Sequence, residues 1–478
     1  MRNKSGYLIK NTIIFTISSF ATKFLSFLLV PLYTSVLTTS EYGIADLIST
    51  TSILMIYIFS LNISDAVLRF VVERLDEPIA ILALSIEIVI GGGLISSIIT
   101  IILCRFHLFS WPRYCYLFLI VMYFSSAING ILSNYARGLD RIKMVGVAGI
   151  LGTTVTICSN LVCLLILKMH LLGYLLSILL GVIVVIVYYW IGLELPIGIQ
   201  IFKNKCNKEI RDRMLFYSIP LVFSNVAWWV NGAFDRYCIT YMIGVDENGI
   251  YSVASKIPLI IATINGVFGQ AWSLSAIKDV SENDEDGFFS NTYNLYNCLL
   301  VGLASCLICF NIPLSKLLFS KDFFAAWQYS SILVISTIFN ALSVFLGGAF
   351  IKTMKTDIYA KSTILATIIN VILNIILINI IGTIGAAVST AISFLVIWGT
   401  RYVMAKKYVE MKVYFAKHMF SYGILIIQIG VEHLVGKYSN YQICFLGIII
   451  IIYWREIKKI IGFLYSVILQ KTKNNLLK

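Results

Sequence analysis

Apolar runs of about 18 to 25 residues recur from one end of the chain to the other. Each run is long enough to cross the roughly 30 Å hydrocarbon layer of a membrane as a helix. The composition agrees, because 59% of the 478 residues are hydrophobic and only 13% are charged, against roughly 25% charged residues in a soluble domain. The runs leave no stretch for a soluble domain. The sequence therefore predicts an all-α, polytopic membrane protein.

The apolar pattern predicts about fourteen transmembrane helices. They cover residues 11–37, 43–68, 79–103, 114–134, 145–167, 171–193, 214–241, 249–273, 290–310, 325–350, 359–380, 382–400, 418–435 and 438–454. The first run lacks a small-residue cleavage site, so we expect a retained helix and not a signal peptide. The basic end of the chain, from 455 onward, predicts an interfacial helix and a tail.

Most of the 37 lysine and arginine residues fall in alternate short loops between these helices. Such an asymmetry sets membrane orientation and predicts that both termini are cytoplasmic. This distribution of lysine and arginine accounts for the net charge of +13, so we expect no binding of nucleic acid. The loops on the opposite side are short, the longest covering about 311–324, which predicts no large extracytoplasmic domain.

No catalytic or metal-binding constellation stands out. The four histidines are dispersed. Cys306 and Cys309 form a CxxC pair, but inside an apolar helix with no second pair or nearby histidine, which does not indicate a zinc or redox site. The sequence predicts neither an enzyme nor a bound cofactor.

Two short motifs suggest an internal repeat. EYGIADL (Glu41 to Leu47) and ENGIYSV (Glu247 to Val253) each open a predicted helix and lie about 206 residues apart, close to six helices. Chance similarity between two short turns is the alternative. A duplication predicts two pseudo-symmetric six-helix bundles related by an axis along the membrane normal. The expected domains are an N-lobe over 1–205, a C-lobe over 206–403, and two additional helices with a basic tail over 404–478.

Several ionisable residues fall within the predicted helices, where a charge costs roughly 2.5 to 3.5 kcal/mol on insertion scales. Such residues tend to face a bundle interior or a hydrated cavity. The polar residues of four of these helices share helical faces, which predicts a polar, partly cationic cavity suited to an anionic group such as phosphate. The candidate cavity residues are Lys23, Asp46, Asn231, Asp235, Arg236 and Lys256.

Several of these residues also have a structural interpretation. Asp46 lies close to the outside boundary and, like Glu41, could do no more than start the second helix. Lys23 and Lys256 have stems long enough to reach a membrane interface, and Arg236 could pair with Asp235 or with an acid on a neighbouring helix. Asp65 and Glu87 are candidates for ion coupling, with a position near a helix end as the alternative for Glu87. Pro31, Pro220 and Pro258 within predicted helices indicate either hinges or static kinks.

Five features of the chain are typical of one known family: the fourteen helices, the repeat, the run NTIIFTISSFATKFLSFLLVPLYTSVLTTSEYGIADL, the segment SDAVLRF (Ser64 to Phe70) and the loop ARGLDR. In these features the chain resembles the polysaccharide (Wzx-type) flippases of the MATE-like multidrug/oligosaccharidyl-lipid/polysaccharide superfamily. The resemblance spans the whole chain and rests on soft motifs. It implies a bacterial inner-membrane protein that moves an undecaprenyl-pyrophosphate-linked O-antigen repeat unit from the cytoplasmic to the periplasmic leaflet. It also implies alternating access, coupled to H⁺ or Na⁺, around a cationic lumen. That lumen corresponds to Lys23, Arg236 and Lys256, joined by Arg69 at the end of the second helix.

The partners implied by the resemblance are the lipid-linked oligosaccharide, membrane lipids, and the O-antigen polymerase with its chain-length machinery. Three other functions stay open: a drug or cation antiporter of the same superfamily, a lipid II flippase, and a membrane glycan polymerase. Acidic residues in the cavity would favour the antiporter. A polymerase would be expected to carry a large periplasmic loop.

Overall fold

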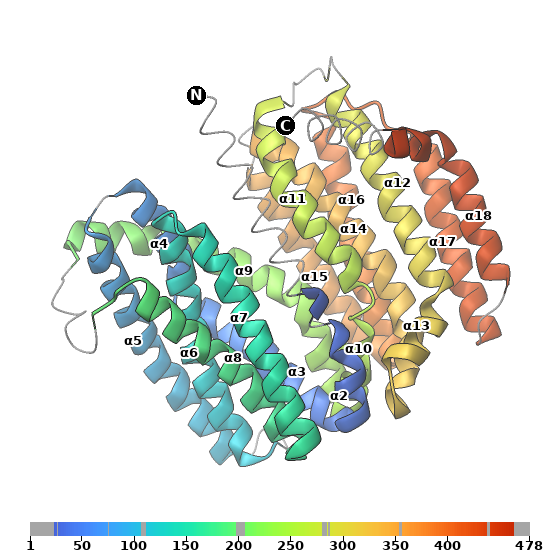
Figure 1. Ribbon diagram of the computed structural model, residues 1–478. Helices are drawn as coiled ribbons and strands as arrows, with labels where there is room; N and C mark the ends of the chain where they lie inside the picture. The colour runs from blue at the N-terminus through green and yellow to red at the C-terminus, as the bar shows by residue number, and fades with distance from the viewer. Residues whose placement is uncertain are drawn as a thin grey trace, which may run out of the picture. The chain divides into compact units, whose positions relative to one another are not determined.

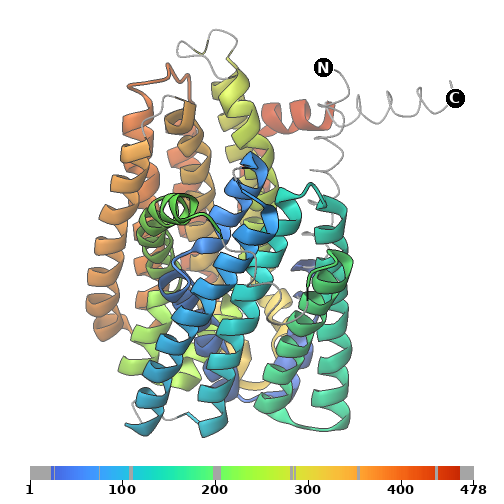
Figure 2. The same ribbon diagram turned by 90° about the vertical axis from the view of Figure 1, so that its left-hand side faces the viewer.

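The computed structural model is helical throughout the residues that it describes, which are 23–25, 27–74, 76–106, 111–196, 206–279, 284, 287–352, 356–436 and 440–462. Within these ranges there is no β-strand, as expected for a chain whose backbone polar groups must be satisfied inside each helix. The chain forms two compact units, Met1–Ser252 and Val253–Lys478. In each unit the long helices pack side by side as a bundle (Figures 1 and 2).

The first unit contains the helices up to α10. They are α2 (Val30–Val36), α3 (Thr39–Phe59), α4 (Ile63–Glu73), α5 (Pro78–Arg105), α6 (Arg113–Gly138), α7 (Ile142–Asn160) with the π-helix η1 (Leu161–Ile166), α8 (His170–Gly192), α9 (Lys208–Met242) and α10 (Val245–Ala254). α6 packs against α3, α4, α5 and α8, while α9 packs against α3 and α4. The boundary between the two units falls within α10, after α9, and not at the predicted lobe boundary near 205.

The predicted helix over 43–68 is wrong as a single element, because the structure divides it into α3 and α4. Leu61 and Asn62 both have φ of 51°, a left-handed conformation that ends a helix and that asparagine tolerates better than most residues. The Asn62 side chain donates a hydrogen bond to Asp65 Oδ2 at 2.7 Å. Asp65 also lies in the first turn of α4, where its negative charge interacts favourably with the positive end of the helix dipole.

Proline has three different effects in the described helices. Pro31 lies in the first turn of α2, where its missing N–H breaks no helical hydrogen bond. Pro220 lies inside α9, which continues past it. The predicted helix over 249–273 is interrupted by a turn that ends at Pro258, and becomes α10 and α11 (Leu259–Asp279).

A capping box begins α3 just before the first repeat motif. The Glu41 backbone N–H donates to Thr38 Oγ1 at 3.2 Å, and the Thr38 backbone N–H donates to Glu41 Oε2 at 2.9 Å. These two bonds satisfy backbone donors that have no partner within the helix. Glu41 therefore starts this helix.

The glycines of the two repeat motifs lie against each other where α3 crosses α10. A Cβ added to Gly43 would lie 2.2 Å from the carbonyl oxygen of Val245, and one added to Gly249 would lie 1.9 Å from the carbonyl oxygen of Thr39. Each glycine thus contacts the residue four positions before the other glycine, which is the reciprocal pattern of a two-fold contact. Asn248 Nδ2 adds a hydrogen bond to the Gly43 carbonyl at 3.2 Å. Only glycine fits at either position.

The second unit contains α11, α12 (Phe288–Cys309), α13 (Asn311–Leu318), the 3₁₀ helix η3 (Lys321–Ala326), α14 (Trp327–Lys352), α15 (Thr356–Ile381), α16 (Thr383–Ala405), α17 (Phe415–Val435) and α18 (Tyr441–Ile452). The predicted loop over about 311–324 is wrong, because α13 and η3 occupy it. Asn311 explains the compact arrangement, since its Nδ2 lies 2.8 Å from the Trp327 carbonyl oxygen and 2.7 Å from Glu432 Oε1.

The last two helices, α17 and α18, belong to the second unit and pack on α12. Polar contacts hold them there: the Tyr422 hydroxyl donates to Asn297 Oδ1 at 2.6 Å, and Asn297 Nδ2 donates to the Tyr453 hydroxyl at 3.0 Å. About two turns further along α12, Gln428 Nε2 donates to the Ser305 carbonyl at 3.1 Å. The segment predicted as an addition over 404–478 is therefore integrated into this bundle through α17 and α18.

Arg401 lies inside α16 and is fully buried, whereas the predicted helix over 382–400 stopped just before it. Its guanidinium donates to the Ser343 carbonyl at 3.0 Å, to Ser362 Oγ at 3.0 Å and to Thr363 Oγ1 at 2.9 Å. The guanidinium carbon also lies 3.7 Å from the ring centroid of Tyr359. Arg401 thus joins α14, α15 and α16 through hydrogen bonds and a cation–π contact.

Two helices expose long apolar faces. On α15 these residues follow helical spacing and are about half exposed: Ile364, Leu365, Ile368, Ile372, Ile375, Ile376 and Ile380. On α5 the same holds for Leu94, Ile95, Ile98, Ile101 and Ile102. Apolar areas of this size belong in contact with lipid. Within the described ranges, ten helices are long and apolar enough to span a membrane, or eleven if α10 and α11 form one span. The protein is a multi-pass membrane protein.

We expect Gly43→Ala to lower the free energy of unfolding by about 1 to 3 kcal/mol, because the added methyl group meets backbone that cannot move aside cheaply. Gly91→Ala is the matched control, since a Cβ there has nothing within 4 Å. Thermal unfolding of the two variants in detergent measures the difference. Equal melting temperatures would contradict the close crossing.

We expect Arg401→Met to lower the free energy of unfolding by about 3 kcal/mol, because buried acceptors lose their donor. Arg401→Lys should recover only part of this loss, since an ammonium group cannot reach three acceptors in a planar fork. Thermal unfolding is again the measurement, with the exposed Lys361→Met on α15 as control. A loss no larger than that of the control would mean that the network contributes nothing.

Candidate functional site

Three helices of the first unit, α3, α9 and α10, bring a charged cluster together inside the bundle. Asp46 is on α3, Asp235 and Arg236 are neighbours on α9, and Tyr251 is on α10. We call these four residues the charged cluster. Its members come from both repeat motifs and from the helix before the second motif.

Arg236 pairs with the acid on the neighbouring helix. Its Nε lies 3.0 Å from Asp46 Oδ2, and the two side chains are only 17% and 13% exposed. Neither of these two atoms has an aligned hydrogen-bond partner among the described residues, so the contact is an ion pair. A second nitrogen of Arg236 donates to the Gly232 carbonyl at 3.3 Å. The guanidinium is therefore held against α3 mainly by charge.

Asp235 is 5% exposed and makes different contacts from Arg236. Its Oδ2 accepts a hydrogen bond from the Tyr251 hydroxyl at 2.6 Å, and its Oδ1 accepts one from the Arg236 backbone N–H at 2.9 Å. A buried carboxylate requires such donors, because it has left water. The cluster thus contains two carboxyl groups and one guanidinium, which is not a surplus of positive charge.

Hydroxyl and indole groups extend the polar region along α3 and α9. The Tyr237 hydroxyl lies 2.6 Å from Thr51 Oγ1, and Trp229 Nε1 donates to the Thr50 carbonyl at 2.8 Å. The Trp229 and Tyr237 rings are 5.4 Å apart between centroids. These aromatic residues, like Tyr251, escaped the sequence interpretation, because an aromatic residue in an apolar run carries no signal of its polar contacts.

The other predicted cavity residues lie on different parts of the chain. Asn231 is on α9, one turn before Asp235, and is 2% exposed. Lys23 is exposed in the short helical stretch at 23–25, and Lys256 lies in the second unit. Glu87 is exposed on α5. The structure therefore brings Asp46, Asp235 and Arg236 together within the first unit.

Arg69 belongs to a separate pocket between α4 and α9, with a volume of about 600 Å³. It pairs with Glu73 at 2.9 Å, and its guanidinium carbon lies 4.7 Å from the ring centroid of Tyr217. The pocket is lined by Arg69, Phe70, Glu73, Glu209, Asp212, Arg213, Phe216, Tyr217 and Pro220. Charges of both signs beside aromatic rings offer donors, acceptors and stacking faces in one place.

The loop before α5 meets the start of α9 at the same end of the first unit. Asp76 Oδ2 accepts a hydrogen bond from the Asn207 backbone N–H at 3.1 Å and lies 3.5 Å from Cys206 Sγ. Partial burial acts to raise the pKa of Asp76, but these donors and the Glu77 N–H outweigh it and lower the pKa below its ordinary value. The predicted orientation places both loops on the cytoplasmic side.

Among the described side chains, no group of three or more His, Cys, Asp or Glu residues is arranged to hold a metal ion. The two cysteines of the CxxC pair, Cys306 and Cys309, lie in α12 as free thiols, and Cys309 is buried.

We expect Arg236→Gln to destabilise the protein by about 3 to 5 kcal/mol, because it leaves Asp46 buried without its counter-charge. The double variant Asp46→Asn, Arg236→Gln should recover much of this loss. A double-mutant cycle on unfolding in detergent measures the coupling.

The matched control for this cycle is the exposed neighbouring pair Arg211 and Asp212, whose coupling should be below about 1 kcal/mol. Equal coupling energies in the two cycles would contradict a buried ion pair.

Comparisons with known proteins agree with this architecture. The chain is similar in structure to the lipid II flippase MurJ in an inward closed conformation, with a TM-score of 0.67, 15% identity, and coverage of 95% of this chain and 100% of that one. It is also similar to an inward-facing multidrug resistance MATE family transporter of the MOP superfamily, with a TM-score of 0.64, 13% identity, and coverage of 82% and 97%. A sequence comparison with curated proteins gave no match.

A family model described as polysaccharide biosynthesis protein matches residues 8–273, which is more than half of the sequence. The match extends from the first apolar run through the charged cluster and both repeat motifs. The chain belongs to the polysaccharide biosynthesis protein family.

Proposed function

We propose that this protein is a transporter that flips lipid-linked oligosaccharides from the cytoplasmic to the periplasmic leaflet of the bacterial inner membrane. The family match supports a role in polysaccharide assembly, and the fold is one that transporters of the MOP superfamily use. A sugar chain and its phosphates cannot cross hydrocarbon unaided, because their polar groups would lose water without replacement. A membrane protein that supplies polar groups along the way removes this barrier.

The observation that carries the proposal is the charged cluster at α3, α9 and α10. Asp235 is buried and Asp46 and Arg236 are largely buried among helices of a membrane protein, and charges in such a position tend to border a transport pathway. The pair is also exchangeable in principle: an anionic phosphate could replace Asp46 as the partner of Arg236, since arginine binds both groups in the same planar geometry. We propose that substrate competes for Arg236 in this way.

The pocket at Arg69 is the proposed first contact for the glycan. Its aromatic faces suit the apolar faces of sugar rings, and its arginines and carboxylates suit hydroxyl groups. The predicted orientation opens this end of α4 and α9 to the cytoplasm, where the lipid-linked unit is made under this proposal. We propose an undecaprenyl-pyrophosphate-linked O-antigen unit as the substrate, and the O-antigen polymerase with its chain-length machinery as partners.

Ion coupling by H⁺ or Na⁺ completes the proposed alternating-access cycle. Asp65 and Glu87 are the candidate coupling groups, together with Asp235, the carboxyl group of the charged cluster that accepts from Tyr251. The presence of two carboxyl groups beside one guanidinium favours a second candidate, a drug or cation antiporter. The family match to polysaccharide biosynthesis supports the flippase over it.

Deleting the gene in a bacterium that makes O-antigen should trap lipid-linked repeat units in the cytoplasmic leaflet. In that strain, Lys23→Ala, Arg236→Ala and Lys256→Ala should each reduce surface glycan by more than any fall in protein level, because each removes a proposed cavity cation. Immunoblots of surface glycan and of the protein are the measurements.

Lys361→Ala is the matched control, because Lys361 is an exposed cation of α15 whose side chain is 79% exposed. Wild-type surface glycan after deletion, with no second flippase present, would overturn the proposed function. Normal export by all three cavity variants would overturn the assignment of the cations.

A further inference from the structure

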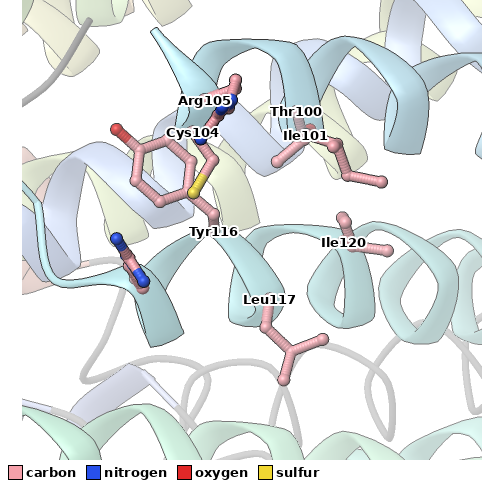
Figure 3. A pocket seen from close by; sticks show the side chains of 8 residues that line it. Thr100, Ile101, Cys104, Arg105, Tyr116, Leu117 and Ile120 are labelled. Carbon is pink, nitrogen blue, oxygen red and sulfur yellow. The ribbon is translucent and has the colours of Figure 1, made fainter. Parts of the chain in front are cut away.

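A second pocket of about 470 Å³ lies at the end of the α5–α6 hairpin, away from the charged cluster and from the Arg69 pocket. It is lined by Thr100, Ile101, Cys104, Arg105, Arg113, Tyr116, Leu117 and Ile120 (Figure 3). The close view shows Ile101 and Ile120 facing each other from the two helices, with Arg105 and Cys104 toward one end.

The pocket changes from cationic to apolar along the hairpin. Arg105 is the last residue of α5 and Arg113 the first of α6, so both guanidiniums belong to the same end. Ile101 lies one turn deeper on α5, and Ile120 lies about two turns deeper on α6. Ile101 is 61% exposed, so the apolar part opens sideways toward lipid. This order matches an amphiphile with an anionic head and a hydrocarbon tail.

The apolar part continues beyond the pocket along α5. Ile98 and Leu94, each 60% exposed, follow Ile101 at helical spacing toward the middle of the span. Their exposed face gives a hydrocarbon chain a surface to lie on. A small soluble anion would gain nothing from it.

Aromatic residues mark the cationic end as a membrane interface. Trp111 lies 5.7 Å from Tyr116 between ring centroids, and Tyr114 lies 6.5 Å from Phe118. Tryptophan and tyrosine are enriched at the level of lipid headgroups, where one end of the ring is apolar and the other is hydrated. The two arginines therefore lie where phosphates of lipids are found.

Arg105 and Arg113 are exceptions to the predicted excess of lysine and arginine in the cytoplasmic loops. The predicted orientation places the α5–α6 hairpin loop on the periplasmic side, where lysine and arginine are scarce. Within the described ranges, neither Arg105 nor Arg113 forms an ion pair. Their charges are thus available to an external anion.

We propose that this pocket binds an anionic phospholipid. The phosphodiester contacts Arg105 and Arg113, and one acyl chain lies along Ile101, Leu117 and Ile120. Arginine suits this task, because its planar donors match phosphate oxygens and it is less strongly hydrated than lysine. The site is independent of the transported substrate, and it predicts that the protein is stabilised by the anionic lipids of its membrane.

The test uses the full-length protein in detergent, with lipid binding followed by native mass spectrometry and by thermal stability. Phosphatidylglycerol should bind more tightly than phosphatidylcholine. In the double variant Arg105→Gln, Arg113→Gln this preference should fall on the order of tenfold, since each cation near an anionic lipid adds a few-fold in affinity. The variant Arg105→Lys, Arg113→Lys should retain most of it.

The matched control is Arg141→Gln, Lys143→Gln, which removes two exposed cations at the opposite end of α6. It should keep the preference for phosphatidylglycerol. Equal binding of the two lipids to the wild-type protein would overturn the proposal, as would an equal loss in the control. Displacement of the lipid by millimolar inorganic phosphate or by glycerophosphoglycerol would also overturn it, because the site would then recognise a soluble phosphate and not a lipid.

Discussion

A charge buried among membrane helices must find its partners on neighbouring helices, because no water is available to solvate it. The structure meets this requirement in two ways. Arg236 takes a carboxylate partner, Asp46, from α3. Arg401 takes hydroxyl and carbonyl oxygens from α14 and α15 and the ring of Tyr359. Each arginine thereby ties its own helix to others, so the arrangement of both bundles depends on where these charges lie.

The two solutions suit different roles. The Arg401 network uses uncharged partners from two other helices, α14 and α15, and leaves no carboxylate for a ligand to replace, which suits a permanent structural joint. Arg236 pairs with a single carboxylate, that of Asp46, and the two contacting atoms lack an aligned hydrogen bond. An anion of similar geometry could therefore displace Asp46. This contrast is the physical reason for placing the proposed substrate contact in the first unit and not at the more deeply buried arginine.

The reciprocal contact of Gly43 with Gly249 adds a geometric constraint near the charged cluster. Asp46 lies one turn beyond Gly43 on α3, and Tyr251 lies two residues beyond Gly249 on α10. The close crossing of the two helices therefore sets how near Asp46 and the Tyr251 hydroxyl can approach α9. The two similar motifs pack on each other and yet contribute to an asymmetric site, because the residues after each glycine differ between them.

The sequence by itself determined the membrane class, the helical fold and most helix positions, because lipid allows few alternatives to an apolar helix of about twenty residues. It also singled out Asp46, Asp235 and Arg236 as unusual. Tertiary structure decided which groups meet: Arg236 pairs across to Asp46 on α3, while Asp235 accepts a hydrogen bond from Tyr251 on α10. It also decided the break at Asn62 and the burial of Arg401. These features depend on which helix faces pack together, and that is a property of three-dimensional contacts that residue spacing along one helix does not contain.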